Sequence, residues 1–258
     1  EIPRWEKWLE KYPGHIATGS VAYRLGRSYE ILDQYALALN WYHTAYCWPS
    51  DTVKFHAYGR LLYLMDVKMS LERIEAVLNN PTLKPELRPL LEYTLALKLV
   101  RSGQYQAGLE KFQDFVKRYE QTPIYALGVG DKLQEHPFQR KGWNFWTKVK
   151  GQQAQLTTLS AYSKQISEIQ PEESAPLRYE IAALIYRQPY IFYNHFWLGQ
   201  RTLYNNVSLI NQNLNQAPVK KEMESFIKEY NNYYHALQIF QELKKINLSP
   251  DLAEKVDF

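Results

Sequence analysis

The sequence contains a single cysteine, Cys47, in 258 residues. One thiol excludes an intrachain disulfide, and it excludes a zinc site made of cysteine ligands. The six histidines do not fall in an HExxH or comparable metal-binding spacing, and no GxSxG motif occurs. We therefore expect no metal site, no cofactor and no catalytic residue.

The chain also has little excess of one charge sign over the other. The formal net charge is +4, and acidic and basic residues are mixed along the chain. A protein that follows a phosphate backbone usually carries a stronger bias, which argues against nucleic acid as the partner. The run from Arg140 to Lys150 mixes cations with Trp143 and Trp146 and is the best nucleic-acid or membrane-surface candidate. We interpret it as a loop anchored by buried tryptophans.

Long apolar runs are absent, since none approaches the roughly 20 residues that span a bilayer. The chain does not begin with Met. We interpret it as a mature or shortened form, in which membrane association would depend on an N-terminal anchor that has been removed.

Glycine is scarce as well, with 11 copies against 21 tyrosines. Because many tight turns need glycine, this favours helices with bulky packing. In "YRLGRSYEILDQYALALNWYHTA", residues 23–45, apolar residues recur at helical spacing and are interrupted at Asp33-Gln34. The stretch predicts two short helices joined by a tight turn, with Gly26 and Ala38 where the helices touch.

The pattern of this stretch repeats along the chain. A shift of 35 residues superposes Tyr23, Tyr58 and Tyr93, and small residues recur where Gly26 aligns with Ala96 and Ala38 with Gly108. The same shift also superposes Leu39, Ile74 and Leu109, and Tyr42, Val77 and Phe112. The period predicts helix pairs at approximately 18–46, 53–79 and 86–119.

Several positions carry a family resemblance. Leu25-Gly26, Tyr29, Tyr35, Ala38-Leu39, Tyr42 and Ala45 resemble the tetratricopeptide repeat, a helix-turn-helix unit of about 34 residues. "QYQAGLEKF" at 104–112 and "YYHALQIF" at 233–240 resemble its second helix. Ala22, Leu61 and Arg73 depart from the pattern. The resemblance implies an all-α fold, an α-solenoid of stacked repeats with an irregular helical C-terminal half.

The expected organisation has three parts. Residues 1–122 hold the repeats, 123–151 form a connecting segment, and 152–258 form a helical region with a degenerate terminal repeat. In the last region we expect helices at 152–169, 174–187, 190–212 and 218–245, with Gln170-Pro171 and Ala217-Pro218 as boundaries.

The resemblance implies a non-catalytic scaffold that binds a peptide or partner protein on the concave face of the superhelix, which the first helix of each unit lines. We expect Tyr23, Tyr58 and Tyr93 to form a ladder there, with Arg27 and Glu30 giving polar selectivity. Buried packing of the same tyrosines is the alternative.

A second hypothesis places function in the C-terminal half. Tyr186, Tyr190, Tyr193 and Trp197 recur at spacings that make a stripe on one helical face. The stripe would line a ligand groove or an enzyme site, with the repeats as support, or it packs in the core. Paired carboxylates such as Glu172-Glu173 and Glu222-Glu224 are interpreted as solvated helix starts.

The N-terminal segment "WEKWLEKYPGH", followed by a repeat, is similar to bacterial envelope assembly factors of the outer-membrane lipoprotein and periplasmic coordinator kind. This similarity favours a scaffold in the bacterial cell envelope, periplasmic or membrane-anchored, over a cytoplasmic adaptor.

Overall fold

Helices make up all the regular structure in the part of the chain that the computed structural model describes, which is residues 1–122, 145–170, 173–197, 217–246 and 248–257. No strand occurs in these ranges, which confirms the all-α prediction. The elements are α1 (Ile2–Lys11), α2 (Thr18–Ile31), α3 (Tyr35–Cys47), α4 (Asp51–Leu62), η1 (Tyr63–Lys68), α5 (Leu71–Leu78), η2 (Pro85–Leu87), α6 (Arg88–Arg101), α7 (Tyr105–Tyr119), α9 (Phe145–Ser167), α10 (Ala175–Arg187), η4 (His195–Trp197), α12 (Ala217–Tyr230), α13 (Asn232–Leu243) and α14 (Pro250–Asp257).

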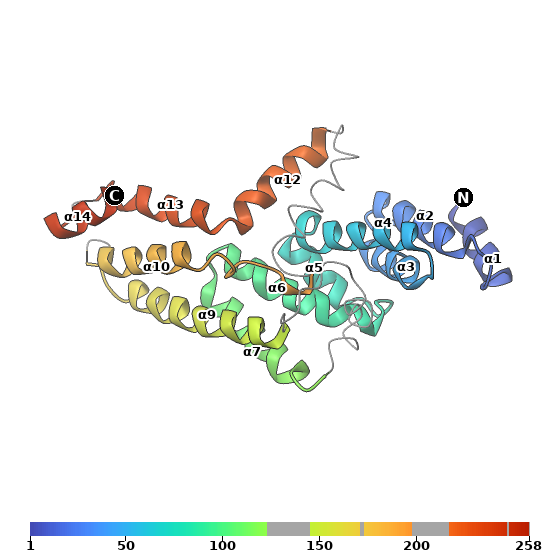
Figure 1. Ribbon diagram of the computed structural model, residues 1–258, viewed down its shortest axis with the longest axis horizontal. Coiled ribbons are helices and arrows are strands. Elements are labelled where there is room, and N and C mark those ends of the chain that lie inside the picture. The colour runs from blue at the N-terminus through green and yellow to red at the C-terminus, as the bar shows by residue number, and fades with distance from the viewer. Residues whose placement is uncertain (123–144, 171–172, 198–216, 247, 258) are drawn as a thin grey trace.

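Three helix pairs occupy the N-terminal half, as the period predicts. They are α2 with α3, α4 and η1 with α5, and α6 with α7. Within and between pairs, α2 packs on α3, α3 on α4, α5 on α6 and α6 on α7. Figure 1 shows these helices following one another from the blue N-terminal end into the green part of the chain.

The turns inside these pairs share one backbone hydrogen bond but differ in conformation. At the first and third turns a residue takes the left-handed conformation that ends many helices, Asp33 with φ 56° and Gly103 with φ 80°. The middle pair reaches its turn through a π-helix, η1, instead. In all three an amide donates to the carbonyl five residues before it, from Gln34 to Tyr29 (2.9 Å), from Met69 to Leu64 (3.0 Å) and from Gln104 to Leu99 (2.9 Å). The bonds lie 35 residues apart.

Glycines lie where paired helices approach closely. A Cβ added to Gly26 would lie 2.6 Å from Cδ1 of Tyr42, and one added to Gly108 would lie 2.5 Å from Cγ2 of Val100. The close α2–α3 contact expected at Gly26 is thereby confirmed. The neighbouring ring pair also recurs 70 residues later, with centroids 5.6 Å apart for Tyr23 and Tyr42 and 5.3 Å apart for Tyr93 and Phe112.

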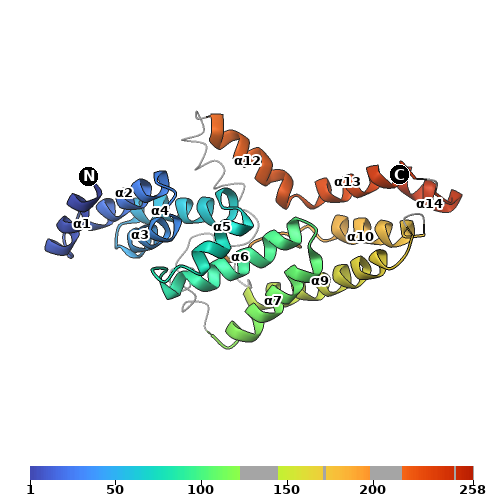
Figure 2. The same ribbon diagram turned by 180° about the vertical axis from the view of Figure 1, so that it is seen from behind.

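The C-terminal half is helical but not a simple continuation. α9 packs on α7, and α10 packs on both α9 and α13. Figure 2 shows α10 between these two helices. α9 begins at Phe145, so the end of the expected connecting segment is helical, whereas residues 123–144 lie outside the described ranges.

The prediction of a helix at 190–212 is wrong over residues 190–197, the part of this range that the structure describes. α10 ends at Arg187, and residues 189–194 run as turns and irregular chain before the short η4. Pro189 explains the stop, because it disfavours helical geometry in the preceding residue and lacks an amide donor. Residues 198–216 lie outside the description. The helix expected at 218–245 is broken at Asn231, whose side chain caps α13 by accepting from the Tyr234 amide at 3.1 Å.

Among the described helices, none is long and apolar enough to cross a membrane.

The Gly26 contact predicts a stability change. Gly26→Ala should destabilise the chain by about 1–3 kcal/mol, because the buried Tyr42 ring that meets the new Cβ is fixed by packing. Gly59→Ala is the matched control, since a Cβ at this helical glycine meets nothing within 4 Å. It should stabilise the chain by up to about 1 kcal/mol through helix propensity. Urea denaturation of both variants checks this, and equal midpoints would contradict it.

Candidate functional site

The Glu30 carboxylate lies at the centre of a charged cluster on the first helices. Its side chain on α2 is only 4% exposed. It accepts hydrogen bonds from the Tyr42 hydroxyl at 2.6 Å and from Nη1 of Arg27 at 3.2 Å. Arg60 of α4 donates to both carboxylate oxygens, and Nζ of Lys68 lies 3.7 Å from Oε1. A single buried carboxylate thus gathers three cations.

This cluster carries surplus positive charge at an accessible surface. The Arg27 and Lys68 side chains are 40% and 23% exposed. The Arg60 guanidinium lies 4.5 Å from the Tyr63 ring centroid, a cation–π geometry that orients it. Burial and the nearby Glu30 carboxylate raise the pKa of the Tyr42 hydroxyl, so it stays a hydrogen-bond donor.

We call the surface that contains this cluster the first-helix face, because α2, α4, η1 and α6 supply it. Around the buried Glu30 it contains Tyr23, Arg27, His56, Arg60, Tyr63 and Lys68, and Lys98 lies buried at its α6 end. Tyr23 is partly buried, and its ring contacts His56 with centroids 6.2 Å apart. The structure therefore brings the predicted Tyr23, Arg27 and Glu30 together. Because Glu30 is buried and shared by three cations, it positions them and does not face a partner.

The predicted tyrosine ladder is wrong for two of its three members. Tyr58 is buried, and its ring lies 6.0 Å from that of Tyr46. Tyr93 is fully buried. Its ring contacts those of Phe112, Phe115, Phe145 and Phe196. The last two of these come from α9 and η4, which cover α6, and the local period gave no sign of this covering.

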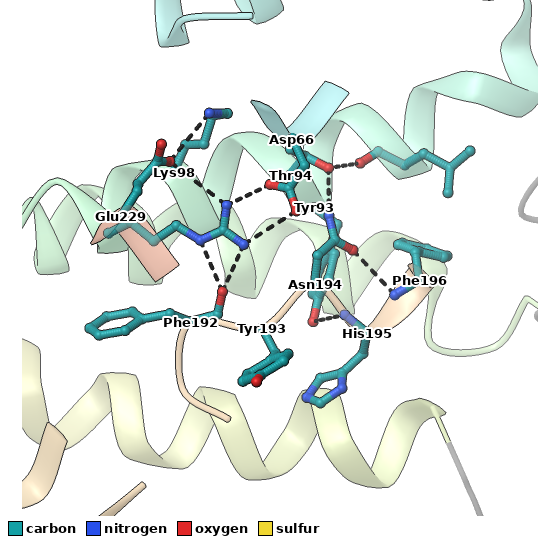
Figure 3. A network of polar contacts seen from close by, with 12 residues as sticks. Asp66, Tyr93, Thr94, Lys98, Phe192, Tyr193, Asn194, His195, Phe196 and Glu229 are labelled. Carbon is teal, nitrogen blue, oxygen red and sulfur yellow. Dashed lines mark hydrogen bonds and ion pairs between the residues drawn. The ribbon is translucent and has the colours of Figure 1, made fainter. Parts of the chain in front are cut away.

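Beneath this face lies a buried junction between the two halves of the chain. Arg101, at the end of α6, donates to Asp66 of η1 from Nη1 at 2.5 Å and from Nη2 at 3.3 Å. It also donates to the carbonyl of Phe192 from Nε at 2.9 Å and from Nη2 at 2.7 Å. Both charged side chains are 0% exposed. Figure 3 shows Asp66 and Phe192 on opposite sides of the guanidinium.

The irregular chain after Pro189 is held by further buried polar bonds. Gln152 of α9 donates to the carbonyls of Tyr190 at 2.9 Å and Tyr193 at 2.8 Å, and it accepts from the Tyr93 hydroxyl at 2.6 Å. Asn194 donates to Thr94 of α6 at 2.9 Å. These bonds replace those that a helix would supply to the same backbone groups.

His195 in η4 is buried as a neutral imidazole. It is 1% exposed, and its Nδ1 atom has no hydrogen-bond partner among the described residues. Burial, followed by the positive charge of Lys148, lowers the pKa of His195 to about 3. The side chain is therefore uncharged throughout the neutral and mildly acidic range, and its role is packing in the junction.

The aromatic residues of the second hypothesis form a cluster, although not one helical stripe. The Tyr186 ring contacts Tyr233 at 5.2 Å between centroids, Tyr190 contacts Tyr193 at 5.6 Å, and Tyr193 contacts Tyr230 at 5.8 Å. Tyr186 and Tyr233 are 56% and 54% exposed. The Trp197 side chain lies outside the description. We call these five tyrosines the tyrosine cluster.

The basic-aromatic run is only partly described. Residues 140–144 lie outside the described ranges. Trp146 is on α9, and its partly buried ring stacks on Phe115 at 5.7 Å, so this part is a helix and not a loop. Lys150 pairs with Glu120 at 3.3 Å. Through these contacts, Trp146 and Lys150 pack against α7 and its C-terminal end.

A pocket of about 400 Å³ opens between the α2–α3 turn and α5. Tyr35, on its wall, donates to Asp33 at 2.5 Å and accepts from Arg73 at 2.8 Å. The side chains of Asp33, Tyr35 and Arg73 thus already bond with one another on this wall.

Comparisons with other proteins add no assignment. The chain matches no family model, no curated protein and no solved structure. Within the described ranges, no group of three or more His, Cys, Asp or Glu side chains is placed to hold a metal ion.

The junction predicts a large effect for a small change. Asp66→Asn keeps the shape but removes the charge, which leaves the buried Arg101 with only the partly exposed Glu229 carboxylate, 3.7 Å away and shared with Lys98. We expect a loss of about 3–5 kcal/mol in the free energy of unfolding. Lys150→Gln, which breaks an exposed pair, should cost less than about 1 kcal/mol. Guanidinium denaturation measures both, and similar losses would show that the junction is not a stability centre.

His195 predicts a pH dependence. The unfolded chain binds a proton at His195 near the ordinary pKa of 6.5, whereas the folded chain binds it only near 3. The unfolded state thus holds more protons between these values, so stability falls as the pH drops through this window. From pH 8 to pH 5 the loss due to this residue should be about 2 kcal/mol. His195→Gln should remove that increment from urea denaturation curves, and an unchanged slope with pH would refute the assignment.

Proposed function

We propose that this chain is a non-catalytic scaffold that binds a partner protein, and that the first-helix face binds a segment of the partner that presents carboxylates. The observation that carries the proposal is the surplus of positive charge around Glu30 on a partly exposed surface. Partner binding through charge complementarity needs such an unbalanced patch.

The proposal includes the assignment of the three helix pairs as tetratricopeptide-like repeats. Three features support it: the amide-to-carbonyl bond that recurs every 35 residues, the ring pair that recurs after 70, and the glycine at the close helix contact. Stacked helix pairs of this kind form extended binding surfaces.

The sign of the partner follows from counting charges. Arg27, Arg60 and Lys68 share the carboxylate of Glu30, which leaves two positive charges (three minus one). The nearby Asp33 faces both Lys68 and Arg73, and Arg73, which lies outside this count, balances its charge. A carboxylate from a partner would reduce this imbalance, whereas a partner cation would increase it.

The tyrosine cluster supports a second candidate, in which the C-terminal half supplies the docking surface and the repeats support it. Exposed tyrosine rings provide rigid contact area and are enriched at binding hot spots. Binding there would depend on aromatic contact more than on charge.

Salt dependence and charge separate these candidates. We expect a fluorescein-labelled, alanine-based helical peptide with glutamates along one face to bind the full chain in fluorescence anisotropy. The same peptide with lysines should not bind. The affinity should fall severalfold from 50 to 200 mM NaCl, because exposed charges are screened over about a Debye length.

Matched variants locate the binding. Arg27→Gln should lower the affinity for the glutamate peptide about three- to fivefold, which is the effect expected of a partly exposed charge pair. Lys111→Gln, on an exposed position of α7, should leave this affinity within twofold of that of the unaltered chain. Equal binding of both peptides, or equal effects of the two substitutions, would reject the first-helix face as the site.

A further inference from the structure

α12 already places two carboxylates on the first-helix face. Glu222 accepts a hydrogen bond from the Tyr63 hydroxyl, and burial, followed by this bond, raises the pKa of Tyr63. Glu229 lies 3.2 Å from Nζ of Lys98 and 3.7 Å from Nη1 of Arg101. Figure 3 shows Glu229 beside Lys98.

An aromatic residue lies between these carboxylates on the same side of α12. Positions 222, 226 and 229 follow the i, i+4, i+7 spacing that lines one face of a helix. Phe226 is buried, and the Arg101 guanidinium lies 5.4 Å from its ring centroid. The face of α12 that docks is thus a carboxylate, an aromatic ring and a second carboxylate.

The contacts of α12 with the repeats fall at one end of the first-helix face. Tyr63 belongs to η1, and Lys98 and Arg101 belong to α6. Tyr63 also lies under the Arg60 guanidinium, so Glu222 reaches the edge of the Glu30 cluster. At the α2 end, Arg27 is partly exposed and His56 is exposed.

α12 is anchored lightly compared with the helices of the repeats. Among its described side chains Phe226 is buried, whereas Lys221, Glu224, Ile227 and Lys228 are exposed. On α6, by contrast, most side chains are buried. Elements with few buried apolar contacts open at lower free-energy cost than the rest of a fold. Figures 1 and 2 both show α12 rising at an angle from its junction with α13.

We propose that α12 is an intramolecular occupant of the first-helix face, and that the partner is an amphipathic helix that presents the same carboxylate–aromatic–carboxylate face and displaces it. This inference rests on the proposed function. It adds the partner's chemistry and a means of regulation, since a partner must compete with a helix of the chain itself.

Charge reversal on α12 tests the inference in the full chain. Glu222→Lys combined with Glu229→Lys places cations against Tyr63, Lys98 and Arg101 without altering the receptor surface. Glu224→Lys is the control, because it reverses an exposed charge on the same helix. The probe is a fluorescein-labelled peptide of residues 217–230, "APVKKEMESFIKEY", and hydrogen exchange of the α12 amides is measured in parallel.

The double variant should bind the peptide at least tenfold more tightly than the unaltered chain, and its α12 amides should exchange at least tenfold faster. Glu224→Lys should match the unaltered chain in both. A peptide with alanine in place of Phe226 should not bind the double variant. If the double variant loses helicity in circular dichroism, Phe226→Ala in the full chain replaces it, with the same expected gain and faster exchange.

Failure of the inference is distinct from failure of the proposed function. Equal peptide affinity for the double variant and the unaltered chain, or unchanged α12 exchange, would overturn the role of α12 alone. If α12 exchanges faster in the double variant but neither this peptide nor the glutamate peptide binds any form, the proposed function is overturned, and the inference with it.

Discussion

Burial of the Arg101 guanidinium is the constraint on which the arrangement of the chain depends. A buried cation is tolerated only when it is paired and its donors are satisfied. Asp66 supplies the charge from η1, and the Phe192 carbonyl supplies the remaining acceptor from a segment 91 residues away in sequence. One side chain therefore joins the middle helix pair, the last helix pair and the C-terminal half, and it fixes the chain that covers Tyr93.

Net charge differs between the two ends of the first-helix face. Around Arg101 and Lys98, the carboxylates of Asp66 and Glu229 balance the two cations. Around Glu30, three cations share one carboxylate, and Glu222 reaches only the neighbouring Tyr63. The balanced end is covered by α12, whereas the unbalanced end is open. A partner helix that displaces α12 would therefore also reach cations that α12 leaves uncompensated.

Local periodicity predicted what depends on local contacts. The helix pairs follow from the 35-residue period. The close contact at Gly26 and the meeting of Tyr23, Arg27 and Glu30 follow from spacing within one or two helical turns. The burial of Tyr93 and the contact of Arg101 with the Phe192 carbonyl depend on residues 145–196, which no period connects to α6. Pro189 indicates the end of α10, but the helical spacing of the aromatic residues predicts a helix across the chain that follows it. Glu222 and Glu229 were readable as one helical face with Phe226, but their partners are set by tertiary packing.

Chemical-shift mapping tests the central claim most directly, because it reports where a carboxylate-bearing helix contacts the chain. The ¹⁵N-labelled, deuterated full chain would be titrated with the glutamate peptide, while the Nε–Hε signals of Arg27 and Arg60 and the backbone amides are followed. The account predicts that both arginine signals and the amides around Tyr23 and Tyr63 shift together. Shifts confined to Tyr186, Tyr190 and Tyr233, with both arginines unchanged, would contradict it and place binding at the tyrosine cluster.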